Sequence, residues 1–208
     1  MFDHVTVRAS DRDASERFYD TVLSTLGIER TNTGEWDDFS IAAAGDGNPV
    51  TRRVHMGFVA PSRAEVDEFW RVGTAAGYAD DGAPGPRPQY TEDYYGAFLL
   101  DPDGNSAEAV HHGSLRRDGG IDHLWVRVAD VAAAKRFYAT IAPHAGLRLA
   151  ADTPERVSFH ARGGRISLVA GTPSENVHIA FPAADATVDA LHLLDPDGNN
   201  VEVVNHKR

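Results

Sequence analysis

An internal duplication is the feature of this sequence that most constrains its fold. Residues 2–21 align with residues 121–140, and ten of the twenty aligned positions are identical. Further along, residues 54–58 align with residues 177–181, and the segment Leu-Leu-Asp-Pro-Asp-Gly-Asn occurs at both 99–105 and 193–199. A repeat of this kind predicts related structural units that pack against each other. We therefore expect a first half at residues 1–113, a linker at 114–120 and a second half at 121–208.

The two copies differ in length between their second and third motifs. The offset between them falls from 123 to 94, so the second copy lacks 29 residues at this point. In the first copy this stretch contains a predicted helix at 62–76, and Ser62 and Glu65 form a capping box at its start. A loop rich in proline and tyrosine follows at 82–95. We expect the second half to be trimmed and its pocket to lack one wall.

Hydrophobic periodicity predicts a mixture of strands and helices. Residues 5–8 alternate between apolar and polar side chains, and Asp11 begins a helix whose apolar stripe ends at Gly27. Short apolar strands are predicted at 39–42 and 166–169, and each Asp-Pro-Asp-Gly segment is expected to form a tight turn. The predicted fold class is therefore α+β.

Composition excludes several classes of function. The 208 residues include 20 basic and 31 acidic side chains, and the resulting charge of −11 disfavours binding to nucleic acid or to a membrane surface. The sequence has no signal peptide and no apolar run of about 18 residues, so we expect a cytoplasmic protein. Cysteine is absent, so any metal site must use nitrogen and oxygen ligands, and ten histidines could supply them.

The repeated histidines and glutamates are candidate metal ligands. Each copy has a histidine on its first strand, a histidine on a middle strand and a glutamate on its last strand: His4, His55 and Glu108, then His123, His178 and Glu202. Two imidazoles and one carboxylate leave metal positions open for substrate. The glutamates interrupt apolar strands, where a buried carboxylate is costly without a compensating partner. The alternative interpretation is that these are buried polar residues bonded to backbone groups.

Together these motifs resemble the vicinal oxygen chelate superfamily, which includes glyoxalase I, fosfomycin-resistance transferases, bleomycin-resistance proteins and extradiol dioxygenases. The resemblance spans nearly the whole chain and rests on Asp-His before Arg-Phe-Tyr, on Val-His at 54–55, and on Asp-Pro-Asp-Gly-Asn before Glu108, each repeated. It implies tandem βαβββ modules that form cupped mixed β-sheets with flanking helices. It also implies that the six repeated ligands hold divalent ions (Zn, Ni, Fe or Mn), and that a small-molecule substrate binds each ion through two adjacent oxygens.

Departures from the family patterns leave lyase, isomerase, transferase and dioxygenase activities open. Glyoxalase I has a fourth ligand, a glutamate, on the strand that corresponds to residues 39–43, where this chain has Ser40, and Ser167 in the second copy. Extradiol dioxygenases have a tyrosine ten residues before the glutamate, where this chain has Phe98 and His192.

Four residues are candidates for substrate binding: Arg8, Arg127, Tyr94 and Trp36. Arg8 lies four residues after His4 on the same strand face, and glyoxalase I has a similar arginine that engages an anionic part of its substrate. Arg127 repeats this position, and an ion pair within the fold is the alternative for both arginines. Tyr94 is expected to share the cup face with Phe98, with packing at the rim as its alternative, and Trp36 is expected to close the mouth of the cup.

Two functions compete at this point. The preferred hypothesis is a metal-dependent enzyme whose working site lies in the first copy, where His4, His55 and Glu108 hold the ion. Arg8 and Tyr94 would then contact a small, oxygenated, anionic substrate. The alternative is a ligand-binding or sequestering protein of the bleomycin-resistance type, in which the cup holds an aromatic or cationic ligand.

The pairing of the modules is a separate open question. Cups form either within each half or across the halves, in which case His4 joins His178 and Glu202. The resemblance implies that both arrangements occur in the family, some of them through homodimers.

Overall fold

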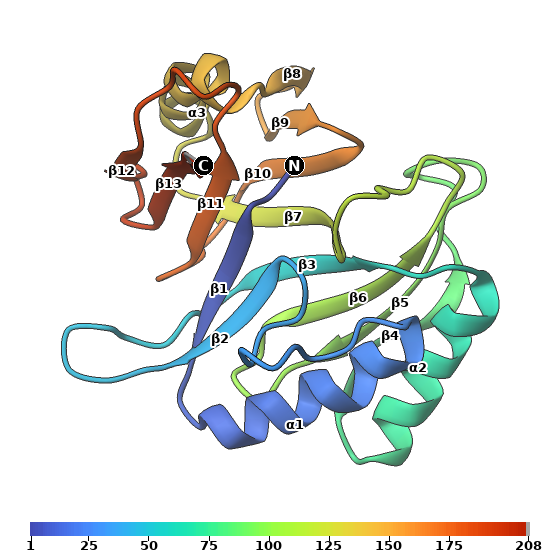
Figure 1. Cartoon of the computed structure of the whole chain (residues 1–208). Coiled ribbons are helices and arrows are strands. Elements are labelled where there is room, and N and C mark those ends of the chain that lie inside the picture. Colours follow the sequence, from blue (N-terminus) through green and yellow to red (C-terminus); the bar gives the residue numbers. More distant parts are fainter. Residues whose placement is uncertain (207–208) are drawn as a thin grey trace.

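Two β-sheets with helices against them make up the described part of the chain, residues 1–206 of a computed structural model (Figure 1). The strands of the larger sheet are β3 (Val54–Val59), β4 (Ala79–Pro86), β5 (Tyr95–Leu100), β6 (Ser106–His111), β7 (Ile121–Val128), β8 (Arg148–Asp152), β9 (Arg156–Ala161) and β10 (Gly164–Ala170). Their order is β4-β5-β6-β3-β7-β10-β9-β8. The smaller sheet consists of β1 (His4–Ala9), β2 (Phe39–Ala43), β11 (His178–Pro182), β12 (Leu191–Leu194) and β13 (Asn200–Val204), in the order β12-β13-β11-β1-β2.

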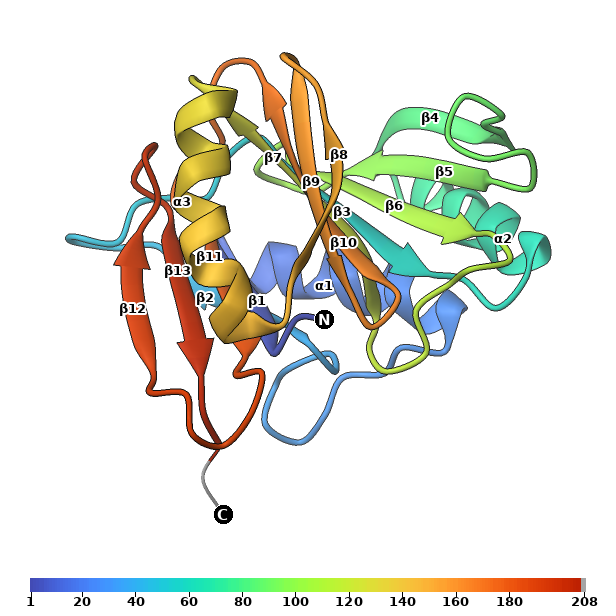
Figure 2. The same ribbon diagram turned by 90° about the horizontal axis from the view of Figure 1, so that it is seen from above.

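The helices are α1 (Arg12–Leu23), with the short 3-10 helix η1 (Ser24–Leu26) after it, α2 (Arg63–Ala75) and α3 (Val131–Ala145). Asp11 accepts a hydrogen bond from the backbone N–H of Ala14 at the start of α1, and Gly27 ends η1 with a φ of 73°. The Ser62 hydroxyl caps α2, as predicted. Helices α1 and α2 pack against each other, and α3 lies between β10 and β13 (Figure 2). None of the helices in residues 1–206 is long and apolar enough to cross a membrane.

Each sheet contains strands from both halves of the chain. Strand β3 pairs with β7 in antiparallel fashion, with Gly57 opposite His123. Strand β1 pairs with β11 in the same way, with His4 opposite Ala180. Each of these pairings joins a strand of the first half to a strand of the second. The modules therefore combine across the halves, which is one of the two arrangements that the sequence left open.

The larger sheet combines the two complete modules. One of them contains α2 and strands β3 to β6, and the other contains α3 and strands β7 to β10. The modules of the smaller sheet are shorter, because β1 and β2 are the only named strands around α1 and no helix lies between β11 and β13 in the described chain. The larger sheet therefore does not belong to the first half alone, because it takes one module from each half.

Trp36 is part of the hydrophobic core and does not close a cavity, which corrects the sequence-based expectation. Its side chain is 1% exposed, and its indole N–H donates to Asp20 at 3.1 Å. A tight turn pairs Trp36 with Phe39 through two backbone hydrogen bonds and directs the indole against the ring of Tyr19.

A buried arginine fixes the linker between the halves. Arg116 is 3% exposed, and its guanidinium donates to the Asp38 carboxylate and to the carbonyls of Phe2 at 3.2 Å and Ile121 at 2.9 Å. Asp38 also accepts the backbone N–H of Gly120 at 3.1 Å. These bonds connect residues just before β1, β2 and β7, and so they hold the two sheets together.

Replacing Arg116 with Met should destabilise the protein strongly, because Asp38 would keep a buried charge without its partner. We expect the free energy of unfolding to fall by about 3–5 kcal/mol, measured by urea denaturation. Arg71→Met is the control, since its ion pair with Glu68 is exposed and its loss should change stability little. Equal stability of the Arg116→Met variant and the wild type would contradict this role.

Candidate metal centre and its cavity

Three side chains of the larger sheet meet at one point: His55 on β3, Glu108 on β6 and His123 on β7. The Nε2 atom of His55 lies 3.0 Å from Oε2 of Glu108 and 3.2 Å from Nε2 of His123. The same Glu108 oxygen lies 3.2 Å from Nε2 of His123. The three atoms therefore form a nearly equilateral triangle, and Glu108 is only 1% exposed.

Two glycines make room for this trio. A Cβ atom at Gly57 would lie 2.2 Å from the ring of His123, and one at Gly96 would lie 2.4 Å from Oε1 of Glu108. Real Cβ atoms do not approach other atoms so closely, so any side chain at either position would have to displace a member of the trio.

The outer atom of each member is also hydrogen-bonded, at 2.8–3.1 Å: His55 Nδ1 to Ser106, His123 Nδ1 to Asp122, and Glu108 Oε1 to the hydroxyl of Tyr94. Such bonds fix the orientation of the ring or carboxylate. The inner nitrogen and oxygen atoms are thereby held toward one another.

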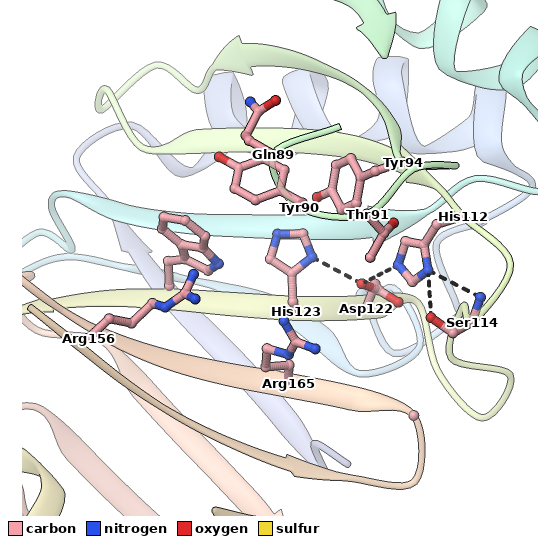
Figure 3. A pocket seen from close by; sticks show the side chains of 12 residues that line it. Gln89, Tyr90, Thr91, Tyr94, His112, Ser114, Asp122, His123, Arg156 and Arg165 are labelled. Carbon is pink, nitrogen blue, oxygen red and sulfur yellow. Dashed lines mark hydrogen bonds and ion pairs between the residues drawn. The ribbon is translucent and has the colours of Figure 1, made fainter. Parts of the chain in front are cut away.

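From His123, hydrogen bonds lead to Asp122 and on to His112 (Figure 3). Oδ2 of Asp122 lies 3.0 Å from Nδ1 of His123 and 3.3 Å from Nε2 of His112. The other Asp122 oxygen accepts the backbone N–H of Arg116 at 3.3 Å. The ring of His112 stacks on Tyr94, with centroids 5.5 Å apart. His112 therefore acts on the trio only through Asp122 and Tyr94.

The repeated Asp-Pro-Asp-Gly-Asn turns position the strands that carry the trio. The Asn105 side chain accepts the backbone N–H of Val54 at 3.2 Å, and Asn199 does the same for Val177 at 3.0 Å. Each of these valines directly precedes a candidate ligand histidine. The aspartates of the Asp-Pro-Asp-Gly-Asn motif therefore belong to a structural turn.

Hydrogen bonding within the trio sets the protonation of its members. Burial alone would raise the pKa of Glu108, but hydrogen bonds with His123 and His55 outweigh it and lower that pKa to about 2. Burial alone would lower the pKa of His123, but the carboxylates of Asp122 and Glu108 raise it to about 9. In the absence of an ion, His123 therefore carries a proton at neutral pH.

A cavity of about 430 Å³ lies over the trio, and a smaller one of about 140 Å³ adjoins it. His123, Trp125 and Tyr94 line both. As alternation along the strand predicted, Tyr94 faces the cavity with Phe98, whereas the hydroxyl of Tyr95 donates to Asp67 on α2. The loop predicted at 82–95 belongs to strand β4 up to Pro86, and both its strand part, at Gly82, and its later part, at Arg87, line the larger cavity.

A second trio lies on the smaller sheet: His4 on β1, His178 on β11 and Glu202 on β13. The Nε2 atoms of His4 and His178 are 2.9 Å apart, but Nε2 of His178 is 3.9 Å from the nearer Glu202 oxygen. Nδ1 of His192 lies 3.0 Å from Oε1 of Glu202. His192 thus takes the place beside Glu202 that Tyr94 takes beside Glu108 in the first trio. The His4 side chain is 38% exposed, so this trio is more open to solvent than the first.

All six predicted ligands fall in these trios, but their grouping differs from the preferred hypothesis. His4 does not join His55 and Glu108, because β1 pairs with β11 in the other sheet, and His123 takes its place. Ser167, on the strand where the resemblance to glyoxalase I implies a fourth ligand, bonds to Ser158 at 2.9 Å.

The predicted substrate-binding arginines also separate. Arg127 lines the larger cavity with Tyr94. Arg8 borders a different hollow, near the second trio, and its guanidinium approaches the carbonyl of Asn176 at 3.4 Å. The expectation that Arg8 and Tyr94 contact one substrate is therefore wrong.

Sequence reasoning missed Asp122, Arg156 and Arg165. Asp122 could have been found, because the Asp-His dipeptide at 122–123 repeats the one at 3–4. The two arginines lie on β9 and β10 outside every repeated motif, so no sequence signal marked them.

In the presence of EDTA, we expect the imidazole of His123 to titrate near pH 9. Glu108→Gln should lower this pKa, because the amide lacks the negative charge that favours the imidazolium. Histidine NMR spectra recorded across the pH range would measure both. Asp67→Asn is the control, since Asp67 is exposed, bonds to Tyr95 and lines neither cavity. A wild-type pKa near the ordinary value of about 6.5 would contradict the hydrogen-bonding scheme.

Comparisons with known proteins agree with this architecture. Residues 1–109 match the Glyoxalase/Bleomycin resistance protein/Dioxygenase superfamily. A glyoxalase/bleomycin resistance protein from Albidiferax ferrireducens T118 is 35% identical, and the match covers 54% of this chain and 99% of that one, with a TM-score of 0.46. Glyoxalase I from Zea mays is 16% identical over 98% of this chain and 92% of its own, with a TM-score of 0.65, and shares the fold. No curated protein matches. The chain belongs to the glyoxalase/bleomycin resistance protein/dioxygenase superfamily.

Proposed function

We propose that the chain is a divalent-metal-dependent enzyme of this superfamily, and that its working site is the trio of His55, Glu108 and His123. The observation that carries the proposal is that three donor atoms lie 3.0–3.2 Å apart beneath a cavity. Neighbouring ligands of an ion with bonds of about 2.1 Å lie about 3.0–3.4 Å apart in octahedral or tetrahedral sites. The spacing of the donors therefore fits an ion such as Zn, Ni, Fe or Mn.

A divalent ion held by the trio would act as a Lewis acid toward two adjacent oxygens of the substrate. The surrounding residues keep the trio in place. Burial and the nearby Glu108 raise the pKa of Tyr94, so its hydroxyl keeps its proton at neutral pH and donates to Oε1 of Glu108. Asp122 likewise holds the ring of His123.

The lining of the larger cavity supports a small, oxygenated, anionic substrate. Aromatic side chains of Tyr90, Phe98 and Trp125 form its walls and suit a ligand with a flat part. Three arginines also line it: Arg53, Arg87 and Arg127. Arg53 is paired with Glu175, and Asp81 and Glu108 also line this cavity, so Arg87 and Arg127 are the guanidinium groups that favour an anion.

Protein purified without chelators should contain metal at this trio. We expect His55→Ala to lower the metal content, measured by elemental analysis, by about one ion per chain, because the two remaining ligands hold an ion much more weakly. His160→Ala is the matched control, since His160 is exposed and belongs to neither trio. Negligible metal in all three proteins, or equal metal in all three, would contradict the proposal.

Asp122→Asn should weaken metal binding about 10- to 100-fold, because an amide holds the His123 ring less firmly than a carboxylate does. Competition with a chromophoric zinc chelator would measure the change. Asp93→Asn provides the comparison, since Asp93 is exposed and bonds to Thr91 and Gly113 outside the trio. An unchanged affinity in Asp122→Asn would show that His123 does not need this hydrogen bond.

A further inference from the structure

Three arginines of the larger sheet face the two cavities without a partner: Arg127 on β7, Arg156 on β9 and Arg165 on β10. Within residues 1–206, none of their guanidinium groups makes a hydrogen bond or an ion pair. Arg127 and Arg165 are exposed and Arg156 is half-buried, so all three guanidinium groups are accessible to a ligand from solvent.

The register of the strands brings these arginines to one side of the sheet. Val169 on β10 lies opposite Arg127 on β7 and also opposite Arg156 on β9. Since neighbouring strands are about 4.8 Å apart, the Cα atoms of these two arginines are roughly 10 Å apart. Arg165 lies opposite His123, one strand away from the candidate metal centre. Long side chains on this scaffold can bind one ligand together.

Arg156 and Arg165 line the smaller cavity together with His123 of the trio. Figure 3 shows Tyr90 and Tyr94 on one side of His123, with Arg156 and Arg165 on the other. Asp122 is the one acidic residue among its lining residues, and it is already bound to histidines on both sides. The free charge at this wall is therefore positive.

We propose that Arg127, Arg156 and Arg165 form an anion cradle for the tail of the substrate, and that this tail carries two negative charges as a phosphate ester or a dicarboxylate. Guanidinium groups bind phosphoryl and carboxylate oxygens through paired hydrogen bonds, which suits this role. Cavities of about 430 Å³ and 140 Å³ limit the ligand to a small molecule. That the bound anion is the tail of a substrate rests on the proposed function, whereas the binding of an anion by these three arginines does not.

The cradle can be tested without any metal. Trp125 lines both cavities, so its fluorescence should report an anion bound there, and calorimetry would give the same affinity independently. The probes are glycerol 2-phosphate, glutarate, acetate and glycerol, each titrated in EDTA at low salt. We expect at least one of the two dianions to bind about 10-fold more tightly than acetate, with no binding of glycerol. The tighter dianion distinguishes a phosphate ester from a dicarboxylate.

Variants locate the binding to these residues. Arg156→Gln and Arg165→Gln should each weaken the dianion about 10-fold, because each removes one charge-assisted contact. Arg136→Gln is the matched control, since Arg136 is an exposed arginine on α3 that lines neither cavity. Dianions that bind no better than acetate, or an unchanged affinity in either cradle variant, would overturn the proposal. Because EDTA is present throughout, loss of the metal centre would show only in the elemental analysis and would leave this result intact.

Discussion

The position of Gly57 between two strands is the constraint on which the candidate metal centre depends. Gly57 lies opposite His123 on β7 on one side and opposite Glu108 on β6 on the other. Because glycine has no side chain, the His123 ring and the Glu108 carboxylate converge over it, and the ring occupies the place of a Cβ atom. The contact also crosses the boundary between the halves, so neither half contains the centre alone.

The second trio shows what happens when this constraint is relaxed. Ala180 occupies the position of Gly57 in the repeat and lies opposite both His4 and Glu202. The methyl group of Ala180 takes up space between the two strands that flank it. The Glu202 carboxylate lies 3.9 Å from Nε2 of His178, whereas the Glu108 carboxylate lies 3.0 Å from Nε2 of His55. The modules around it are also shorter, so water reaches this trio and weakens its electrostatic interactions. The buried trio is therefore the better candidate for chemistry.

The sequence predicts local structure well, because local structure depends on nearby residues. Helix caps such as Asp11 and Ser62 and the repeated turns are local signals, and the structure confirms them. The choice of strand partner is different. Strands β1 and β7 share one motif and β3 and β11 share another, so their hydrophobic patterns favour pairing within a half as much as across halves. Trp36 escaped prediction for a related reason, since its direction depends on a turn with Phe39.

The linker between the halves stabilises the fold and also supports the candidate metal centre. Arg116 uses its guanidinium to hold Asp38 next to the start of β7, and uses its backbone N–H to bind the carboxylate of Asp122. Asp122 in turn fixes the ring of His123. One residue thus joins the two sheets and orients a candidate ligand, so a change that loosens the linker would reach the cavity through two hydrogen bonds. A centre built across a duplication depends on such a connection, because its ligands come from segments that the chain alone does not hold side by side.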